Sequence, residues 1–353
     1  MNLAYYVSGH GFGHISRSYE VIKYLREKAP IDNLFVITTR KDFVKDKQKN
    51  LIFRDVSLDV GMIQLSSISL DIKRTLDAIY EFEKNKNTLM ESEIDFLQRE
   101  KIDCIVSDSS SLPFLLAKKL GIPSYFVGNF TWDFIYDNYR KESSYFGKYS
   151  DILKEEYSNC DFGFILPFHC PMNSILKKTE IGIIGRRSFR ERSEIRSSLG
   201  FTNENKYFLF SFGAYGISSE LGYKNLKENE WIVVSGYEGL VGEKVIDVKD
   251  IYYPDLLKAC DYVLTKPGYG ILSESYLANT PIIYTERGDF AEYEYLVNAM
   301  NQFHVAAFLE QRELLEFRFE TAVKKIEIDK KEKSVPILED GRQSILKQIF
   351  YLA

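Results

Sequence analysis

Short apolar runs alternate with amphipathic stretches along most of the chain, a pattern typical of a parallel sheet covered by helices. In the first half the apolar runs predict strands at residues 3–8, 34–39, 51–56, 102–107 and 124–127. The stretches between them predict helices at residues 15–28, 69–101 and 112–120, the last of which ends at Gly121. Together these elements predict one doubly wound α/β domain in the first half of the chain.

The pattern restarts after a junction near residues 168–188, which holds Pro171 and leads into the run GRRSFRER at residues 185–192. Strands are predicted at residues 207–212, 231–235, 245–248, 262–265 and 281–284, with helices around Leu256 and at 271–278. We therefore expect an α/β fold of two facing Rossmann-like, doubly wound domains. The first domain is expected at residues 1–170 and the second at 188–335, and a C-terminal helix within 336–353 is expected to pack back on the first. Because ligands bind outside the carboxyl ends of such strands, the site is expected between the domains.

Composition and charge exclude several classes of function for this chain. The chain has 353 residues, of which 45% are hydrophobic, enough for two cored domains. Its 46 basic and 51 acidic side chains give a net charge of −5, so nucleic acid is not an expected partner. The four cysteines lie far apart, no signal-peptide pattern is visible and no window of 18 apolar residues occurs. We expect a cytoplasmic protein without a transmembrane segment, and peripheral contact with a membrane stays open.

The first candidate motif is SGHGFGHISR at residues 8–17, between the first predicted strand and its helix. Gly11 and Gly13 allow close backbone approach to a ligand, and His10 lies in the same loop. His14 stands where a dinucleotide fingerprint requires glycine, which argues against a nicotinamide cofactor. A neutral His14 can accept a proton from an attacking hydroxyl if Asp108, at the end of another strand, orients it. The alternative is that His14 and Asp108 only cap helices.

The second candidate motif is TKPGYGILSES at residues 265–275, again a strand, a glycine turn and a helix. Lys266 supplies a cation for a diphosphate and Glu274 a carboxylate for ribose hydroxyls. No Walker sequence is present, and an ordinary turn is the alternative. A further glycine turn at residues 211–216 includes Gly213, which we expect to face the same ligand unless it is a plain loop.

Two other clusters each allow a structural and a functional interpretation. The aromatic segment at residues 129–139 either packs internally or lines the acceptor side. The arginines near the junction are either a solvated linker and helix face or a contact for diphosphate or an anionic acceptor. They are Arg186, Arg187, Arg190, Arg192 and Arg196.

These motifs resemble those of UDP-dependent glycosyltransferases with the GT-B fold. Their donor-binding motif is similar in spacing to Lys266, Gly268, Tyr269, Gly270, Glu274 and Pro281. GFGH at residues 11–14 with Asp108 resembles the His and Asp dyad of that superfamily and the glycine loop of the peptidoglycan N-acetylglucosaminyltransferase. GFGHISR also resembles the UDP-sugar hydrolase of pseudaminic acid synthesis. HGFGHISR, IPSYFVGNFTWDFIY and KPGYGILSES together resemble the glycosyltransferase-like N-terminal region of L-arabinokinases.

The resemblance implies a nucleotide-sugar donor bound by the domain at 188–335 and an unidentified acceptor on the side of the domain at 1–170. It also implies a His14–Asp108 pair as base and orienting group. Where many members carry an Asp-Gln or Gln-Gln pair, this chain has GDFAEYEYL, which puts Phe290 and Glu292 near the sugar hydroxyls. No D-x-D motif occurs, so we expect neither a metal nor another cofactor. The expected function is inverting, metal-independent sugar transfer from a UDP-sugar. The alternatives are a UDP-sugar hydrolase and a non-catalytic nucleotide-sugar-binding module.

Overall fold

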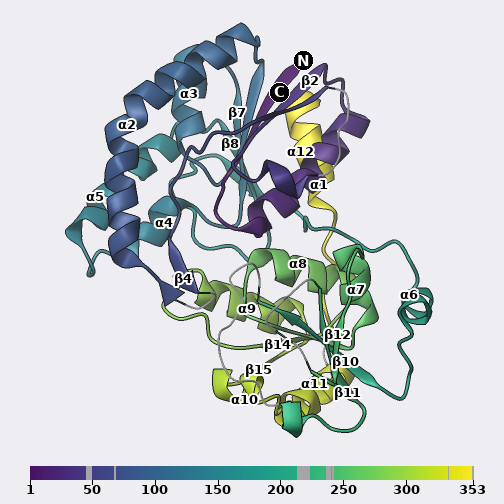
Figure 1. Ribbon diagram of the computed structural model, residues 1–353. Coiled ribbons are helices and arrows are strands. Elements are labelled where there is room, and N and C mark those ends of the chain that lie inside the picture. The colour runs from purple at the N-terminus through teal and green to yellow at the C-terminus, as the bar shows by residue number, and fades with distance from the viewer. Residues whose placement is uncertain are drawn as a thin grey trace. The chain divides into compact units, whose positions relative to one another are not determined.

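The chain divides into two compact units. The computed structural model describes residues 1–44, 50–66, 69–212, 223–235, 240, 242–332 and 334–351. The first unit comprises Met1–Ile63, Leu70–Ile184 and the segment from Leu338 onward, and the second comprises Gln64–Ser69 and Gly185–Ile337 (Figure 1). Each unit is built around its own parallel sheet.

The sheet of the first unit has the order β3-β2-β1-β6-β7-β8-β9 in the described residues, and all its neighbours are parallel. This is the Rossmann order, which winds outward in both directions from β1 and β6. Val7 on β1 pairs with Asp108 on β6, so both strands end at the same edge. The strands are β1 (Asn2–Val7), β2 (Asn33–Ile37), β3 (Leu51–Arg54), β6 (Cys104–Asp108), β7 (Ser124–Gly128), β8 (Phe162–Ile165) and β9 (Lys178–Glu180).

Helices cover both faces of this sheet. Ala4 and Tyr6 on β1 pack in one core cluster with Phe96 and Leu116 of α2 and α3, whereas α1 and α12 lie on the opposite face (Figure 1). Arg342 joins α12 to α1, since its guanidinium lies 5.0 Å from the Tyr24 ring. The helices of this unit are α1 (Phe12–Lys28), α2 (Ile72–Arg99), α3 (Leu112–Leu120), α4 (Trp132–Asp137), α5 (Ser144–Tyr157) and α12 (Gly341–Phe350), with a 3-10 turn, η1, at Lys41–Phe43.

The second unit repeats the same winding. Its sheet has the order β12-β11-β10-β13-β14-β15 within the described ranges, again with parallel neighbours. The strands are β10 (Lys206–Ser211), β11 (Glu230–Val234), β12 (Val245–Asp247), β13 (Tyr262–Thr265), β14 (Ile282–Tyr284) and β15 (Ala306–Phe308). The helices are α6 (Arg192–Leu199), α7 (Tyr253–Ala259), α8 (Tyr269–Ala278), α9 (Tyr293–Phe303), α10 (Gln311–Leu315) and α11 (Glu320–Glu332), with a 3-10 turn, η2, at Tyr223–Asn225.

The core of the second unit is rich in aromatic rings. Phe208 on β10 stacks on Tyr262 of β13 at 5.0 Å and on Phe319 at 4.5 Å, beneath α11. Phe208 is fully buried, so these contacts form the centre of the cluster that joins the sheet to α10 and α11. Aromatic residues make up 14% of the chain, and part of this content therefore serves packing.

The junction differs from the prediction. Residues 178–180 form β9, which extends the first sheet, and the first unit continues to Ile184 rather than ending near residue 170. Ile183 then forms a β-bridge with Asp340, the residue before α12. The chain therefore leaves the first unit after Ile184 and returns to it at Leu338 at neighbouring positions. The helix predicted at 69–101 begins at Ile72, because residues 69–70 form β5 (Ser69–Leu70), which pairs with β4 (Gln64–Ser66).

Candidate functional site

Each of the two motifs lies at the point where the strand order of its own sheet reverses. In the first sheet the strand order reverses between β1 and β6, and in the second between β10 and β13. His14 lies in the first turn of α1, the helix that follows β1, and Lys266 lies in the turn that follows β13. Such reversal points leave a crevice at the carboxyl edge of a sheet, which is where doubly wound folds bind ligands.

The glycine loop after β1 is shaped by a close approach and by one special backbone conformation. A Cβ on Gly9 would lie 2.3 Å from Thr39 Oγ1, so only glycine fits there without a shift. Gly11 has φ of 77° and immediately precedes α1, a left-handed conformation that favours glycine. Gly13 lies exposed in the first turn of α1, where a Cβ would meet no described atom within 4 Å. At Gly9, Gly11 and Gly13 the loop thus brings backbone to the sheet edge with no side chain of its own.

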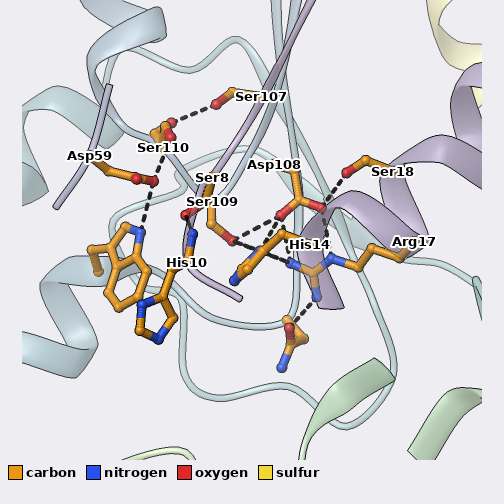
Figure 2. A network of polar contacts seen from close by, with 12 residues as sticks. Ser8, His10, His14, Arg17, Ser18, Asp59, Ser107, Asp108, Ser109 and Ser110 are labelled. Carbon is orange, nitrogen blue, oxygen red and sulfur yellow. Dashed lines mark hydrogen bonds and ion pairs between the residues drawn. The ribbon is translucent and has the colours of Figure 1, made fainter. Parts of the chain in front are cut away.

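His14 and Asp108 are brought together as the sequence suggests. The Nδ1 atom of His14 lies 2.8 Å from Oδ1 of Asp108, and both side chains are buried (Figure 2). Nδ1 also lies 3.1 Å from Arg17 Nη2, which can only donate, whereas the carboxylate can only accept. The shorter contact, with Asp108, favours the neutral tautomer that carries its proton on Nδ1 and its lone pair on Nε2, as a general base at Nε2 requires.

Asp108 also binds Arg17, a contact that the sequence analysis did not anticipate. Arg17 Nε lies 2.7 Å from Oδ2, and Nη2 lies 2.7 Å from Oδ1 (Figure 2). Ser18 Oγ donates to Oδ2 at 2.6 Å. Burial would raise the pKa of Asp108, but the charge and hydrogen bonds of Arg17, followed by His14, hold it well below its usual value. Asp108 is thus a permanently ionised carboxylate inside the protein.

The backbone after β6 contributes to the same network. Ser109 adopts φ of 68°, which is uncommon for a residue other than glycine and turns the chain sharply after the strand. Its hydroxyl lies 3.1 Å from Asp108 Oδ1, and Tyr157 donates a hydrogen bond to its carbonyl. The strained turn is thereby fixed from both sides.

A second carboxyl group lies near the glycine loop. Ser110 Oγ donates to Asp59 Oδ2 at 2.6 Å and Trp132 Nε1 donates to it at 3.2 Å (Figure 2). Burial raises the pKa of Asp59, an effect that these donors, with Ser8 and the charge of His14, partly oppose. His10 rests edge-on against Trp132 at 5.1 Å. His10 therefore lies beside this second group, while His14 contacts Asp108.

In the second unit, Lys266 directly follows β13 and Gly268 precedes α8. Gly268, at the N-cap of α8, has no side chain that could cap the helix, which begins at Tyr269 and Gly270. Burial and then the charge of Arg287 lower the pKa of Lys266 to about 7. An anionic ligand at this turn would favour the charged lysine.

Glu274 lies on α8 and is buried, with 4% of its surface exposed. Both its oxygens accept hydrogen bonds from Arg186, at 2.6 Å from Nε and 2.9 Å from Nη2. The Arg186 guanidinium also lies 5.5 Å from the Tyr253 ring. Arg186, the first side chain of the junction cluster, therefore contacts the carboxylate expected to bind ribose rather than bulk water.

Phe290 and Glu292 both contact Arg287. The guanidinium lies 4.1 Å from the Phe290 ring, and its Nη1 lies 3.0 Å from Glu292 Oε2. Nη1 also donates to the Pro267 carbonyl at 3.0 Å, beside Lys266. Gly213, the remaining predicted donor residue, lies outside the described residues.

Sequence reasoning named the two motifs but missed three arginines that organise them. Arg17 belongs to the GFGHISR run and Arg186 to the junction cluster, so the sequence draws attention to both but does not say which carboxylate each one binds. Arg287 lies next to the GDFAEYEYL segment. Arg17 and Arg186 carry no local signal because their carboxylate partners come from distant elements, and the contact of Arg287 with the Pro267 carbonyl joins it to a turn 20 residues away.

The chain resembles part of a known kinase in sequence. No family model matches the chain. L-arabinokinase of Arabidopsis thaliana is 31% identical over 321 residues, which cover 88% of this chain and 31% of that protein. The chain thus spans about a third of the length of this relative.

Solved structures share the fold across both units. UGT89C1 of Arabidopsis thaliana, solved with UDP, gives a TM-score of 0.63 at 12% identity and covers 99% of this chain and 98% of that one. A UDP-glucosyltransferase from Polygonum tinctorium, capable of glucosylating indoxyl, gives 0.64 at 12% identity over 99% and 97%. The chain therefore has the GT-B fold of UDP-dependent glycosyltransferases, as the resemblance implied.

Two kinds of feature are missing from the described residues. No helix in these ranges combines the length and apolar character needed to cross a membrane. Across the same residues, no group of three or more His, Cys, Asp or Glu side chains is placed to hold a metal ion.

Proposed function

We propose that this protein is a glycosyltransferase that moves a sugar from a UDP-sugar to an acceptor hydroxyl, with inversion and without a metal ion. The observation that carries the proposal is the 2.8 Å contact between His14 Nδ1 and Asp108 Oδ1 at the reversal point of the first sheet. Its setting supports it, because the fold is shared with proteins solved with UDP or named as UDP-glucosyltransferases.

In the proposed reaction Nε2 of His14 accepts the proton of the acceptor hydroxyl. The hydroxyl oxygen then forms a bond to the anomeric carbon, and the bond from that carbon to the UDP oxygen breaks with its electron pair. Asp108 keeps the imidazole in the required tautomer and stabilises the imidazolium that forms. A single displacement of this kind inverts the anomeric centre.

The departing UDP gains negative charge, and the turn after β13 is the proposed place where this charge is stabilised. Lys266 supplies a cation there, and the first backbone N–H groups of α8 add partial positive charge. Fixed donors stabilise the transition state more than the ground state because the charge develops during the reaction. In this proposal Glu274 contacts the ribose, and the protein's own cations take the place of a divalent ion.

The proposal is tested by incubating the intact protein with a panel of UDP-sugars and hydroxyl-bearing acceptors, and by following UDP release and glycoside formation together. We expect glycoside of inverted configuration at a rate that EDTA does not change. Retained configuration would contradict the single displacement, and a loss of activity in EDTA would contradict metal independence. UDP release at a rate independent of any acceptor would replace transfer with hydrolysis.

A second candidate is a nucleotide-sugar-binding module without turnover. It is favoured by the way Asp108 is bound, since Arg17, Ser18 and Ser109 donate to it besides His14. Such a network also suits a purely structural role for the carboxylate. The match to a part of L-arabinokinase agrees with a module that serves another activity. UDP binding without product from any UDP-sugar would favour this candidate.

A further inference from the structure

We infer that Arg287 is a second cation for the diphosphate of the nucleotide-sugar, held in position by Phe290 and Glu292. The inference rests on the proposed function and deepens it. It assigns Phe290 and Glu292 to the support of a phosphate-binding arginine, whereas the resemblance implied contact with sugar hydroxyls.

The first support is topological. β13 and β14 are parallel neighbours, and Thr265 on β13 pairs with Tyr284 on β14. The residues that follow these two partners, Lys266 and the run from Thr285 to Arg287, therefore emerge at the same edge of the sheet. The contact between Arg287 Nη1 and the Pro267 carbonyl, at 3.0 Å, brings the guanidinium to the Lys266 turn.

The second support is the way the Arg287 guanidinium is held and which of its N–H groups are hydrogen-bonded. Its side chain is 11% exposed, and the Phe290 ring lies 4.1 Å from it, so the group is fixed in orientation. Nη1 accounts for both hydrogen bonds of Arg287, to Pro267 and to Glu292. Within the described residues, Nε and Nη2 make no hydrogen bond, and these two donors suit bidentate binding of a phosphate.

The third support is electrostatic. Lys266 and Arg287 are close enough that the charge of Arg287 helps lower the pKa of Lys266, after burial. Two neighbouring cations in a partly buried turn repel each other, and a dianion bound by both removes the repulsion. Glu292, which is 3% exposed, offsets part of the charge of Arg287 until a ligand arrives.

The test is calorimetric titration of the intact chain with UDP, UMP and uridine. The variants are Arg287→Gln, Arg287→Lys and the control Arg312→Gln, which removes an exposed arginine of the same unit that pairs with Glu316. We expect Arg287→Gln to weaken UDP binding by about 10- to 100-fold and to leave uridine binding unchanged, with UMP in between. Arg287→Lys should lose part of the affinity, and Arg312→Gln none.

The variant Glu292→Gln keeps the test decisive if Arg287→Gln fails to fold. Glutamine at this position can still accept the hydrogen bond from Arg287 Nη1 but carries no charge, so Arg287 stays in position and is no longer partly neutralised. UDP should then bind several-fold more tightly, whereas a purely structural pair predicts unchanged or weaker binding. UDP affinity within twofold of the unmodified protein in Arg287→Gln, or equal loss for UDP and uridine, overturns the inference while the proposed function stands. If the unmodified protein itself binds no UDP, the proposed function fails and this inference with it.

Discussion

Arg186 binds both carboxylate oxygens of Glu274, at 2.6 Å and 2.9 Å, inside the second unit. The carboxylate that we expect to contact ribose is therefore already engaged in the free protein. Its remaining lone pairs are those not facing Arg186, so a ribose must approach from the other side or displace the guanidinium. The pair gives Glu274 both a structural and a proposed binding role.

These two roles can be separated. Glu274→Ala leaves Arg186 largely buried without its partner, and we expect a loss of about 3 kcal/mol in the free energy of unfolding. The double variant Arg186→Met with Glu274→Leu removes both charges and should recover much of that stability. If Glu274 also binds ribose, UDP affinity stays low in the double variant. Thermal unfolding and calorimetry decide this, and normal UDP affinity in the double variant would remove Glu274 from the binding site.

His14 carries the chemical step of the proposed mechanism. We expect His14→Ala to lower turnover by at least about 10²-fold, because the variant loses the base that Asp108 orients, and to leave UDP affinity within about twofold. His169→Ala, which removes a partly exposed histidine of the same unit, is the matched control. A His14→Ala protein that keeps its turnover, or that loses UDP affinity instead, would reject His14 as the base.

Arg17 is expected to control stability as a function of pH. Asp108 has a pKa below its unfolded value, so its contribution to stability is present above about pH 4 and is lost as the pH falls toward the folded pKa. Arg17→Met leaves a buried carboxylate without its cation, at an expected cost of about 3–5 kcal/mol at pH 7. The deficit should shrink near pH 4, since the unpaired carboxyl then takes up a proton.

The measurement for Arg17 is thermal unfolding from pH 4 to pH 8. Arg99→Met, on the exposed side of α2, is the control and should change the melting temperature little at any pH. A deficit for Arg17→Met that is the same at both ends of the range would mean that lost packing, and not the charge of Asp108, causes it.

Lys266 is expected to lower the stability of the free protein. Its pKa falls from 10.5 to about 7 on folding, so the unfolded chain binds more protons between these values and stability rises with pH across that window. The full cost, at most about 5 kcal/mol, is present below pH 7. We therefore expect Lys266→Met to raise the melting temperature, more at pH 6 than at pH 9, while it weakens UDP binding.

The control for Lys266 is Lys249→Met, which removes a lysine that is 74% exposed. Thermal unfolding with and without UDP at both pH values provides the measurement. A Lys266→Met protein that is less stable than the unmodified one at pH 6 would show that this lysine holds the turn together and is not a cation kept for a ligand.

The elements that the sequence predicts best are strands buried on both faces of their sheet. Residues 262–265 are predicted as a strand and form β13, because four buried residues in a row leave a continuous apolar run. The strand β9 was missed because Lys178–Glu180 is an exposed edge, with no apolar alternation. Helix α9 was also missed, since it follows Glu292 and lacks the Ser, Thr, Asp or Asn that usually caps a helix.

For the candidate site too, the sequence predicts contacts that follow from the sheet but not those that depend on helix packing. His14 and Asp108 are predictable as a pair because His14 comes soon after β1 and Asp108 ends β6, and the ends of neighbouring parallel strands meet at one edge. The arginines are not predictable in this way, because Arg17 is 91 residues from Asp108 and Arg186 is 88 residues from Glu274. Which carboxylate an arginine meets depends on how helices pack on the sheet, and no local period encodes that.

Thermal unfolding of the intact chain with a panel of nucleotides and nucleotide-sugars tests the central claim most directly. A ligand at 100 times its dissociation constant adds about 2.7 kcal/mol to the free energy of unfolding. We predict that UDP and at least one UDP-sugar raise the melting temperature, and that uridine raises it less because it brings no phosphate to Lys266. A panel in which no uridine diphosphate compound shifts the transition at millimolar concentration would contradict the account.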